Sequence, residues 1–354
     1  MRIELSERLR GLQGPVMVTG HTGFKGTWLT LLLQELGIPV IGLSLEPAED
    51  SLFDRAQRLG SIPEEFTDIR DIDSVNRFVS KYQPSVIIHM AAQPLVLESY
   101  KAPRETFEIN VMGTTNILSA AFLEASAIAV GVVTTDKVYR NDESGKAFVE
   151  SDALSGKDPY SASKAATESV AKAWQQIARV SGGPRVISLR AGNVLGGGDW
   201  AEHRILPSLI RAFKNQDNIE LRNPNSTRPW MHVLDVLYGY LLAIEHEIQG
   251  NETEAFNFGP NTRSLTVKRI AELSQSAWPY PVKISAQKNP ISKDFEAGSL
   301  SLNSTKAEQT LGWSPVWSQE QAVVSTVKWW DKIFNHNVSP FDACMDDIRT
   351  LLKS

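Results

Sequence analysis

The chain has 354 residues, enough for about two domains at ~150 residues each, or for one large α/β unit with a cap. Its 36 basic and 41 acidic residues give a formal net charge of −5. A general nucleic-acid binder needs a basic surface, so this balance excludes that class and leaves small anionic ligands open. The single cysteine, Cys344, can form neither an intrachain disulfide nor a cysteine-rich zinc site. We therefore expect a cytoplasmic protein.

The sequence also argues against a membrane partner and a metal site. No apolar run approaches the ~18 residues that a membrane span requires. The N-terminal stretch MRIELSERLRG lacks the apolar centre of a signal peptide. No two histidines have the spacing of metal ligands, so we predict no metal.

Short β-branched runs alternate with helical patterns from Pro15 to about Arg190. This alternation predicts an α/β fold with a Rossmann-type, doubly wound parallel sheet. The expected strands are Val16–Thr19, Val40–Leu45, Val86–His89, Ile128–Thr134 and Arg185–Leu189, and the expected helices lie near 26–36, 71–82, 104–124 and 161–179. In the first helix, leucines at 29, 32, 33 and 36 predict one buried face, and Gly37 and Pro39 end the helix.

After Arg190 glycine and proline interrupt this pattern, which predicts a smaller, irregular α/β domain that binds the substrate. A helix and a strand within 230–260 are expected to rejoin the first domain. The predicted domains are therefore a nucleotide-binding domain of residues 1–190 and 230–260 and a substrate domain of residues 191–229 and 261–354. The tail after Trp330 is less periodic, and the sequence assigns it no role.

A glycine-rich loop, TGHTGFKG, follows the first predicted strand and opens the first predicted helix. Gly20 permits a tight turn, Gly23 lets backbone N–H groups approach a pyrophosphate, and Gly26 lets the helix pack close to the sheet. The helix N-terminus adds a partial positive charge. A glycine-rich turn in an unrelated protein is the alternative, but the strand–loop–helix context favours a dinucleotide cofactor.

The end of the second strand bears on which dinucleotide is bound. The strand ends at Ser44, Glu46 follows, and no arginine occurs before Arg55. A hydroxyl can bond a ribose, and no cationic cluster awaits a 2′-phosphate, so NAD is favoured over NADP. Asp68 and Ile69 either hold an adenine edge or cap the helix at 71–82, and the sequence leaves both open.

Two residue pairs carry catalytic chemistry. Tyr160 and Lys164 lie four apart on a predicted helix, where a neighbouring ammonium favours the phenolate, so that the tyrosine can act as a general base. Asp136 and Lys137 follow a strand end, beyond which ligands bind in parallel sheets. Dehydrogenation needs only one base, so this extra acid and base suggest a second proton transfer. The alternative is a solvated surface pair.

Several segments together resemble the extended short-chain dehydrogenase/reductase family, in matching order between about residues 10 and 330. They are TGHTGFKG, HMAAQPLV, NVMGT, TDKVY, DPYSASK, RAGNVLGGGDW, RPWMHV and NFGP. Within the family, TDK, GGGDW and RPW-x-H resemble the nucleotide-sugar 4,6-dehydratases that take CDP-glucose, whereas those that take dTDP-glucose carry TDE. The chain departs from the usual pattern at Ala162, where the family commonly has Asn, and in TTDKVY and RPWMHV, where the family more often has TSDKCY and RPWQHV. The segment between Tyr139 and Asp158 is also shorter than expected. These changes spare the catalytic positions and border the substrate.

The resemblance implies an enzyme, a hydro-lyase of deoxysugar biosynthesis that removes water from a CDP-sugar by internal hydride transfer from C4 to C6 through NAD. Tyr160 would take the C4 hydroxyl proton and Thr135 would bond the sugar. Asp136 would be the acid and Lys137 the base for the C5 proton. A lysine acts as a base only when neutral, so its pKa must be lowered.

The resemblance also implies the binding residues. Those for the cofactor are Gly20, Thr22, Gly23, Phe24, Lys25, Gly26, Ser44, Asp68, Ile69, Ala91, Ala92, Gln93, Tyr160 and Lys164. Those for the substrate are Gln93, Thr135, Asn193, Arg204 and Arg228, since arginines suit a pyrophosphate. Trp200 and Trp230 either line the base pocket or belong to the core. A homodimer through helices near 104–124 and 161–179 is implied as well.

Other functions remain as alternatives. A nucleotide-sugar 4-epimerase of the same fold needs no acid–base pair beyond the tyrosine and lysine. A dehydratase acting on a dTDP- or UDP-sugar would share the reaction but not the base. A non-catalytic NAD-sensing protein need not keep Tyr160 and Lys164, and this chain has both.

Overall fold

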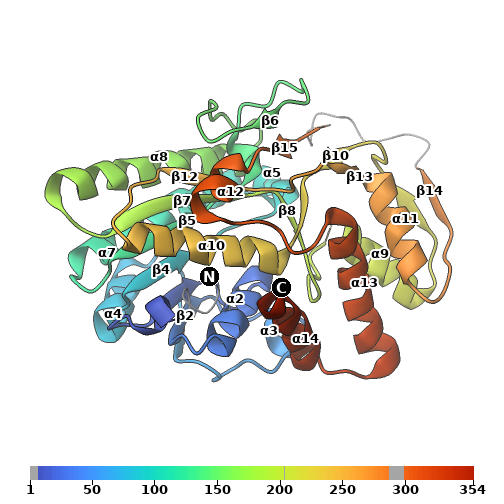
Figure 1. Cartoon of the computed structure of the whole chain (residues 1–354), viewed down its shortest axis with the longest axis horizontal. Helices are drawn as coiled ribbons and strands as arrows, with labels where there is room; N and C mark the ends of the chain where they lie inside the picture. The colour runs from blue at the N-terminus through green and yellow to red at the C-terminus, as the bar shows by residue number, and fades with distance from the viewer. Residues whose placement is uncertain (1–6, 203, 287–298) are drawn as a thin grey trace.

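The computed structural model describes residues 7–202, 204–286 and 299–354, so the first six residues of the N-terminal stretch and part of the second predicted domain lie outside it. Its centre is a seven-stranded sheet in the order β12-β7-β5-β4-β1-β2-β3 (Figure 1). All six strand pairs in this sheet are parallel. The predicted Rossmann-type, doubly wound sheet is confirmed. The strands are β1 (Val16–Thr19), β2 (Val40–Ser44), β3 (Glu64–Phe66), β4 (Val86–His89), β5 (Ala129–Val133), β7 (Arg185–Ala191) and β12 (Ala255–Phe258).

The central strands β1, β4 and β5 are buried along their whole length because helices cover both faces of the sheet. Successive side chains of a strand point to opposite faces. In β1, Val16 and Val18 pack in the core on one face, whereas Met17 packs in the core on the other. The first core includes helices α2 (Phe24–Glu35) and α10 (Val233–Ile248), and the second includes α4 (Ile72–Tyr82), α7 (Gly113–Leu123) and α8 (Pro159–Ser181).

Several short helices, turns and strands accompany the large sheet. They are helices α3 (Leu52–Arg55), α5 (Val96–Lys101) and α6 (Pro103–Phe107), the turns η1 (Glu108–Met112) and η2 (Asp136–Val138), and the strands β6 (Ala147–Phe148) and β15 (Ser301–Leu302). The helix expected over 104–124 is thus three segments, α6, η1 and α7, because the chain widens into one π-helical turn at η1.

Most of the remaining elements lie at the right-hand side of Figure 1, whereas the helix Thr305–Leu311 lies near its centre and packs against α10 and β12. Three short two-stranded sheets, β8–β11, β9–β14 and β10–β13, join segments far apart in the sequence. The elements are β8 (Asn193–Leu195), β9 (Ile219–Leu221), β10 (Thr227–Arg228), β11 (Trp230–His232), β13 (Leu265–Thr266), β14 (Ile284–Ala286), α9 (Ile205–Asn215), α11 (Val267–Ala277), α12 (Thr305–Leu311), α13 (Gln319–His336) and α14 (Pro340–Lys353). Between them, α10 and β12 return to the large sheet. The division into two domains stays a prediction.

The C-terminal tail packs against helix α2 and helps to bury it. Residues from Gly26 to Leu33 of α2 are all buried, so this helix has no free face, although the leucine spacing predicted only one buried side. The physical reason is that α14 and α10 pack against it. Trp28 of α2 donates its indole N–H to the carbonyl of Gly197 at 3.0 Å. The tail after Trp330 therefore covers α2.

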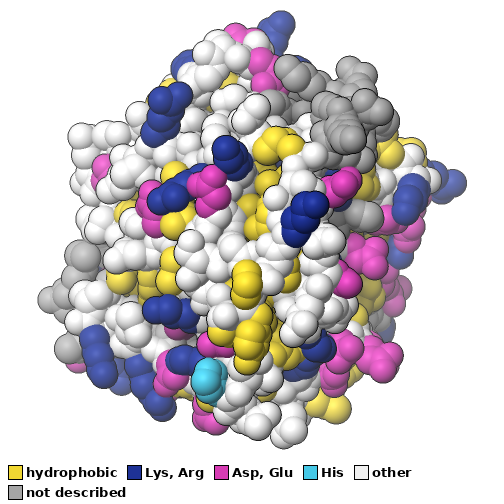
Figure 2. Space-filling view, turned by 90° about the vertical axis from the view of Figure 1, so that its right-hand side faces the viewer, with side chains coloured by type: hydrophobic (Ala, Val, Ile, Leu, Met, Phe, Trp, Pro, Cys, Tyr) yellow, Lys and Arg dark blue, Asp and Glu magenta, His cyan; other side chains and the backbone are white. Residues whose placement is uncertain are grey.

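The surface carries mixed charges. On the face that Figure 2 shows, hydrophobic side chains form a broken strip between lysine, arginine and acidic side chains. Within the described ranges, no helix is both long enough and apolar enough to cross a membrane. Grouped metal ligands, meaning three or more His, Cys, Asp or Glu side chains, do not occur in the part of the chain that the structure describes.

Asp235 of α10 fixes the segment that precedes α13. Its carboxylate accepts the backbone N–H of Val316 at 2.7 Å and of Trp317 at 3.2 Å, and its side chain is buried. Substituting Asp235→Ala leaves two buried N–H groups without these acceptors, so we expect the free energy of unfolding to fall by about 3 kcal/mol. Urea denaturation measures this. The exposed Asp217→Ala is the control and is expected within about 0.5 kcal/mol of the parent; equal stability of both variants would contradict the assignment.

Candidate active site

One large cavity, of about 1110 Å³, lies at the carboxyl ends of the strands of the large sheet. Residues that follow β1, β2, β3, β4, β5 and β7 all line it, and so do residues of the smaller elements from Asn193 to Val267. In parallel sheets this edge is where ligands bind. The cavity exceeds the ~300–1,000 Å³ of a typical small-molecule site, which is large enough for two nucleotide-sized ligands side by side.

The glycine-rich loop forms a tight cradle at one end of the cavity. Gly20 has φ +71°, a left-handed conformation that favours glycine. A Cβ on Gly26 would lie 2.1 Å from the carbonyl oxygen of Gly20, so any side chain there would force the helix off the loop. Gly23 begins α2 without a side-chain cap, which leaves the helix N-terminus to an anion. These residues fit the pyrophosphate of a dinucleotide.

The end of β2 carries hydroxyls rather than cations. The hydroxyl of Thr22 lies 2.6 Å from that of Ser44, and Thr22 also donates to the carbonyl of Leu45 at 3.1 Å. Both side chains line the cavity. This pair places oxygen atoms where a ribose is expected and no positive charge for a 2′-phosphate.

Asp68 and Ile69 also line the cavity. The residue that caps α4 is Asp71, whose carboxylate accepts the N–H of Ser74, so the alternative in which Asp68 caps this helix is wrong. Asp68 instead pairs with Arg70 at 2.6 Å, and this guanidinium lowers the pKa of the Asp68 carboxyl. Asp68 thus stays ionised at the rim of the cavity.

Three residues after β5 form the acid–base end of the site. Thr135 caps the short turn η2 and donates its hydroxyl proton to Asp136 Oδ1 at 3.0 Å. The Nζ atom of Lys137 lies 3.7 Å from the same oxygen. Asp136 is fully buried, and its second oxygen, Oδ2, has no hydrogen-bond partner among the residues that the structure describes. An unpartnered buried carboxyl oxygen is costly unless it carries a proton or meets a ligand.

Tyr160 and Lys164 face the same region from the start of α8. Asp158 caps this helix, and the backbone N–H of Tyr160 donates to Ser99 at 3.1 Å. Burial raises the pKa of Tyr160 to about 12, opposed by a hydrogen bond with Thr135. Burial lowers the pKa of Lys164 to about 8, and its Nζ donates to the carbonyl of Val133 at 3.1 Å. Desolvation, rather than the lysine four residues on, therefore dominates the titration of Tyr160 in this structure.

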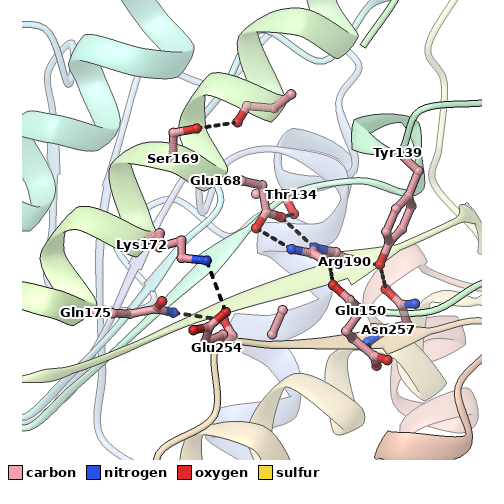
Figure 3. A network of polar contacts seen from close by, with 12 residues as sticks. Thr134, Tyr139, Glu150, Glu168, Ser169, Lys172, Gln175, Arg190, Glu254 and Asn257 are labelled. Atoms are coloured by element: carbon pink, nitrogen blue, oxygen red, sulfur yellow. Dashed lines mark hydrogen bonds and ion pairs between the residues drawn. The ribbon is translucent and has the colours of Figure 1, made fainter. Parts of the chain in front are cut away.

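A buried polar network supports this end of the site from below (Figure 3). Arg190 of β7 donates to both carboxylate oxygens of Glu168 on α8, at 2.9 and 2.8 Å, and the same carboxylate accepts the hydroxyl of Thr134 at 2.5 Å. Arg190 also donates to the Tyr139 hydroxyl, which donates to Asn257 at 2.6 Å. Burial raises the pKa of Tyr139 to about 12. The network ties the strand ends of β5, β7 and β12 to α8.

The two arginines expected at the substrate come from the smaller elements and border the cavity. Arg204 and Arg228 both line it. Arg204 pairs with Asp199 at 2.9 Å, and this carboxylate raises the pKa of the guanidinium. Arg228 is buried and donates to the carbonyl of Thr227. Asn193 lines the cavity, and its side-chain oxygen is buried without a partner.

The structure brings most, but not all, of the expected side chains to the cavity surface. Gln93, Asp136 and Lys164 are not among its lining residues. The amide of Gln93 is used within its own loop, where its oxygen accepts the N–H of Leu95 and its nitrogen donates to Thr106. Ala91, Ala92 and Phe24 do line the cavity.

Trp200 and Trp230 lie in different environments. Trp230 lines the cavity and donates its indole N–H to Leu265. Trp200 packs at 4.7 Å against the ring of Trp330 and belongs mainly to the hydrophobic core.

Sequence reasoning passed over Asp199, Glu168, Arg190 and Tyr139. Asp199 lies in the GGGDW motif, five residues before Arg204. Its closeness to an arginine that was predicted to bind an anion could have identified it as a site residue. The other three hold their places through contacts between residues at least 22 positions apart in the sequence, such as Glu168 with Arg190. Spacing along the chain carries no sign of such contacts.

Comparison with known proteins adds to this geometry. Residues 16–259 match the model of the NAD dependent epimerase/dehydratase family. The chain is 38% identical, over 89% of its own length and 89% of the relative's, to CDP-glucose 4,6-dehydratase of Salmonella typhimurium. It is 27% identical to UDP-glucose 4-epimerase of Halalkalibacterium halodurans, over 92% of this chain and 97% of that one.

Solved structures agree in fold. An epimerase from Methanothermobacter thermautotrophicus superposes with a TM-score of 0.80 at 21% identity and covers 94% of this chain and 96% of its own. A UDP-glucose 4-epimerase from Thermotoga maritima, solved with UDP-glucose, has a TM-score of 0.76 at 23% identity and covers 90% and 99% of the two chains.

The Glu168–Arg190 pair is testable by a double-mutant cycle. Removing one partner leaves a buried charge uncompensated, so Glu168→Leu and Arg190→Leu are each expected to lower the free energy of unfolding by about 3–5 kcal/mol. The double variant removes both charges and is expected to lose much less than the sum. Denaturant unfolding of the four proteins measures the coupling. The exposed pair Lys268–Glu272 is the matched control, with an expected coupling of about 0.2–0.5 kcal/mol. Additive losses at Glu168 and Arg190 would contradict the role given to the pair.

Proposed function

The chain belongs to the NAD dependent epimerase/dehydratase family, and from this premise we propose that it dehydrates CDP-glucose to CDP-4-dehydro-6-deoxyglucose. The observation that carries the proposal is the placement of Asp136 and Lys137 beside Thr135 at the end of β5. A 4-epimerase has no step that needs this acid and base. The identity of 38% to a CDP-glucose 4,6-dehydratase over most of both chains supports the same substrate.

The cofactor is the NAD of the family. It supplies a hydride acceptor for C4 and a hydride donor for C6, so that none is consumed. On the side of the protein, Gly20, Gly23 and Gly26 form the cradle for its pyrophosphate. Thr22 and Ser44 offer hydroxyls to a ribose.

Tyr160 and Thr135 act on the sugar hydroxyl at C4. Because Tyr160 is protonated over the whole neutral range in this structure, it needs nearby positive charge to become a base. The Lys164 ammonium on the same helix face is the protein group placed for that task. Thr135 bonds both Tyr160 and Asp136, so its hydroxyl links the oxidation step to the elimination step.

Asp136 and Lys137 carry the elimination. The 4-ketone acidifies the C5–H bond; Lys137 takes this proton, and Asp136 gives a proton to the departing C6 oxygen, which leaves as water. Among the described residues Oδ2 of Asp136 has no hydrogen-bond partner, so this oxygen is the one available to the departing group. Lys137 lines the cavity with a side chain that is 30% exposed, so it can reach a bound sugar.

The nucleotide end of the substrate is held by residues of the smaller elements. Arg204 and Arg228 offer guanidinium groups to the substrate pyrophosphate, and Asn193 and Thr135 offer hydrogen bonds to the sugar. We further propose a cytoplasmic homodimer. Exposed apolar side chains on the helices between 104 and 181 support it: Phe107, Met112, Leu123, Ile177 and Val180.

Incubation with CDP-glucose, dTDP-glucose and UDP-glucose tests the reaction and the base together. We expect CDP-glucose alone to lose one water, detected by mass spectrometry. Tyr160→Phe is expected to lower kcat by about 10²–10⁴, whereas the control Tyr280→Phe, at an exposed tyrosine, leaves kcat unchanged. Inversion at C4 without loss of water would identify a 4-epimerase. Dinucleotide binding with no conversion of any of the three sugars would identify a sensor.

The role of Lys137 is tested in deuterium oxide. With the parent enzyme we expect the product to gain solvent deuterium at C5. We expect Lys137→Ala to slow this exchange by about 10²-fold or more while the nucleotide sugar still binds. Lys157→Ala, at another lysine that lines the cavity, is the control. Exchange at the parent rate in Lys137→Ala would show that a different group takes the C5 proton.

A further inference from the structure

The glycine-rich loop contains Lys25, a lysine that forms no ion pair with any carboxylate of the described residues. Lys25 is the second residue of α2 and lines the cavity. Its Nζ lies 5.7 Å from the centre of the Tyr240 ring on α10, a cation–π contact. Among the residues that the structure describes, no carboxylate lies within ion-pair distance of it.

Cations surround this amine. Lys164 on α8 and Arg204 at the start of α9 both repel its positive charge, and Asp136 in η2 is the acid that attracts it. Asp136 already faces Lys137 at 3.7 Å, and the acid beside Arg204, Asp199, is paired at 2.9 Å. The acids of the site are therefore committed to other cations.

The consequence is an amine that titrates in the neutral range. Burial, together with the charges of Lys164 and Arg204, lowers the pKa of Lys25 to about 7. At neutral pH the amine is about half protonated. A group in this position changes its protonation whenever the charge in the cavity changes, since an opposite charge within ~4–6 Å favours the charged form.

We propose that Lys25 takes up a proton from solvent when the anionic dinucleotide binds, so that cofactor binding at this site is linked to pH. The inference rests on the proposed function, which places a dinucleotide pyrophosphate at the N-terminus of α2. The phosphates supply negative charge beside an amine whose neighbouring acids are already paired with other cations. No bond is made or broken: a neutral amine becomes an ammonium that faces a phosphate.

The sign of the linkage follows from these charges. Below the pKa of the free protein, about 7, Lys25 is already an ammonium, and binding is tightest without proton uptake. Above it, each binding event must also protonate Lys25. The dissociation constant is therefore expected to rise with pH, by up to about tenfold per pH unit, until the higher pKa of the bound state is passed.

Isothermal titration of NADH into the full chain, freed of nucleotide, tests the linkage. Binding enthalpies at about pH 8 in buffers of different ionisation enthalpy give the number of protons taken up. We expect the parent to take up at least half a proton more per NADH than Lys25→Met. Lys25→Arg keeps a permanent positive charge, so it should bind NADH with affinity close to the parent at neutral pH but without the Lys25 proton. Lys172→Met, at an exposed lysine on α8, should behave as the parent.

Two results would overturn the proposal. One is an equal proton uptake in the parent and in Lys25→Met or Lys25→Arg. The other is a pH-independent affinity of the parent for NADH between about pH 7 and pH 9. Failure of the parent to bind NADH at any pH would instead refute the proposed function, and the linkage with it.

Discussion

The ion pair between Glu168 and Arg190 is the interaction on which the catalytic end of this protein depends. It joins α8 to β7 through two hydrogen bonds inside the protein, where both side chains are almost fully buried. Two charges removed from water are stable only when each compensates the other with good geometry. The bidentate contact meets that condition, and it fixes α8 in one position relative to the sheet.

The position of α8 in turn sets the rest of the site. Tyr160 and Lys164 lie on its first two turns, about two turns and one turn before Glu168 respectively. The carboxylate of Glu168 also holds Thr134, next to Thr135 and Asp136. The same negative charge raises the pKa of Lys164 against the effect of burial. One carboxylate thus places the tyrosine helix against the strand end of β5 and keeps Lys164 cationic at neutral pH.

The features of the fold and the site that depend on residues close together in the sequence were predictable. The strands Val16–Thr19 and Val86–His89 were expected with the bounds they have, because β-branched runs and glycine boundaries are local signals. The glycine loop and the residues after β5 followed from spacing and from the rule that ligands bind at strand ends. The full burial of α2 was not predictable, because its second buried face exists only where α14, more than 300 residues later, packs on it.

The same limit applies to charge. Sequence reasoning required a lowered pKa of Lys137, produced by burial or by a nearby cation. The side chain that three-dimensional packing surrounds with cations is Lys25, from a loop 112 positions earlier in the sequence. Whether a lysine is neutral depends on the sum of the charges within a few ångströms, and no spacing rule contains that sum.

This arrangement also explains how an acidic chain binds anions. The net charge of −5 describes the whole surface, where acidic and basic side chains alternate. Inside the cavity Lys25, Lys137 and Arg204 line one continuous space, with Lys164 just behind its wall. Because the interior has a lower effective dielectric constant than water, these few charges act more strongly on a phosphate than many exposed ones. When no ligand is bound, burial and the repulsion among these positive charges lower the pKa of Lys25, the amine without a carboxylate partner among the described residues.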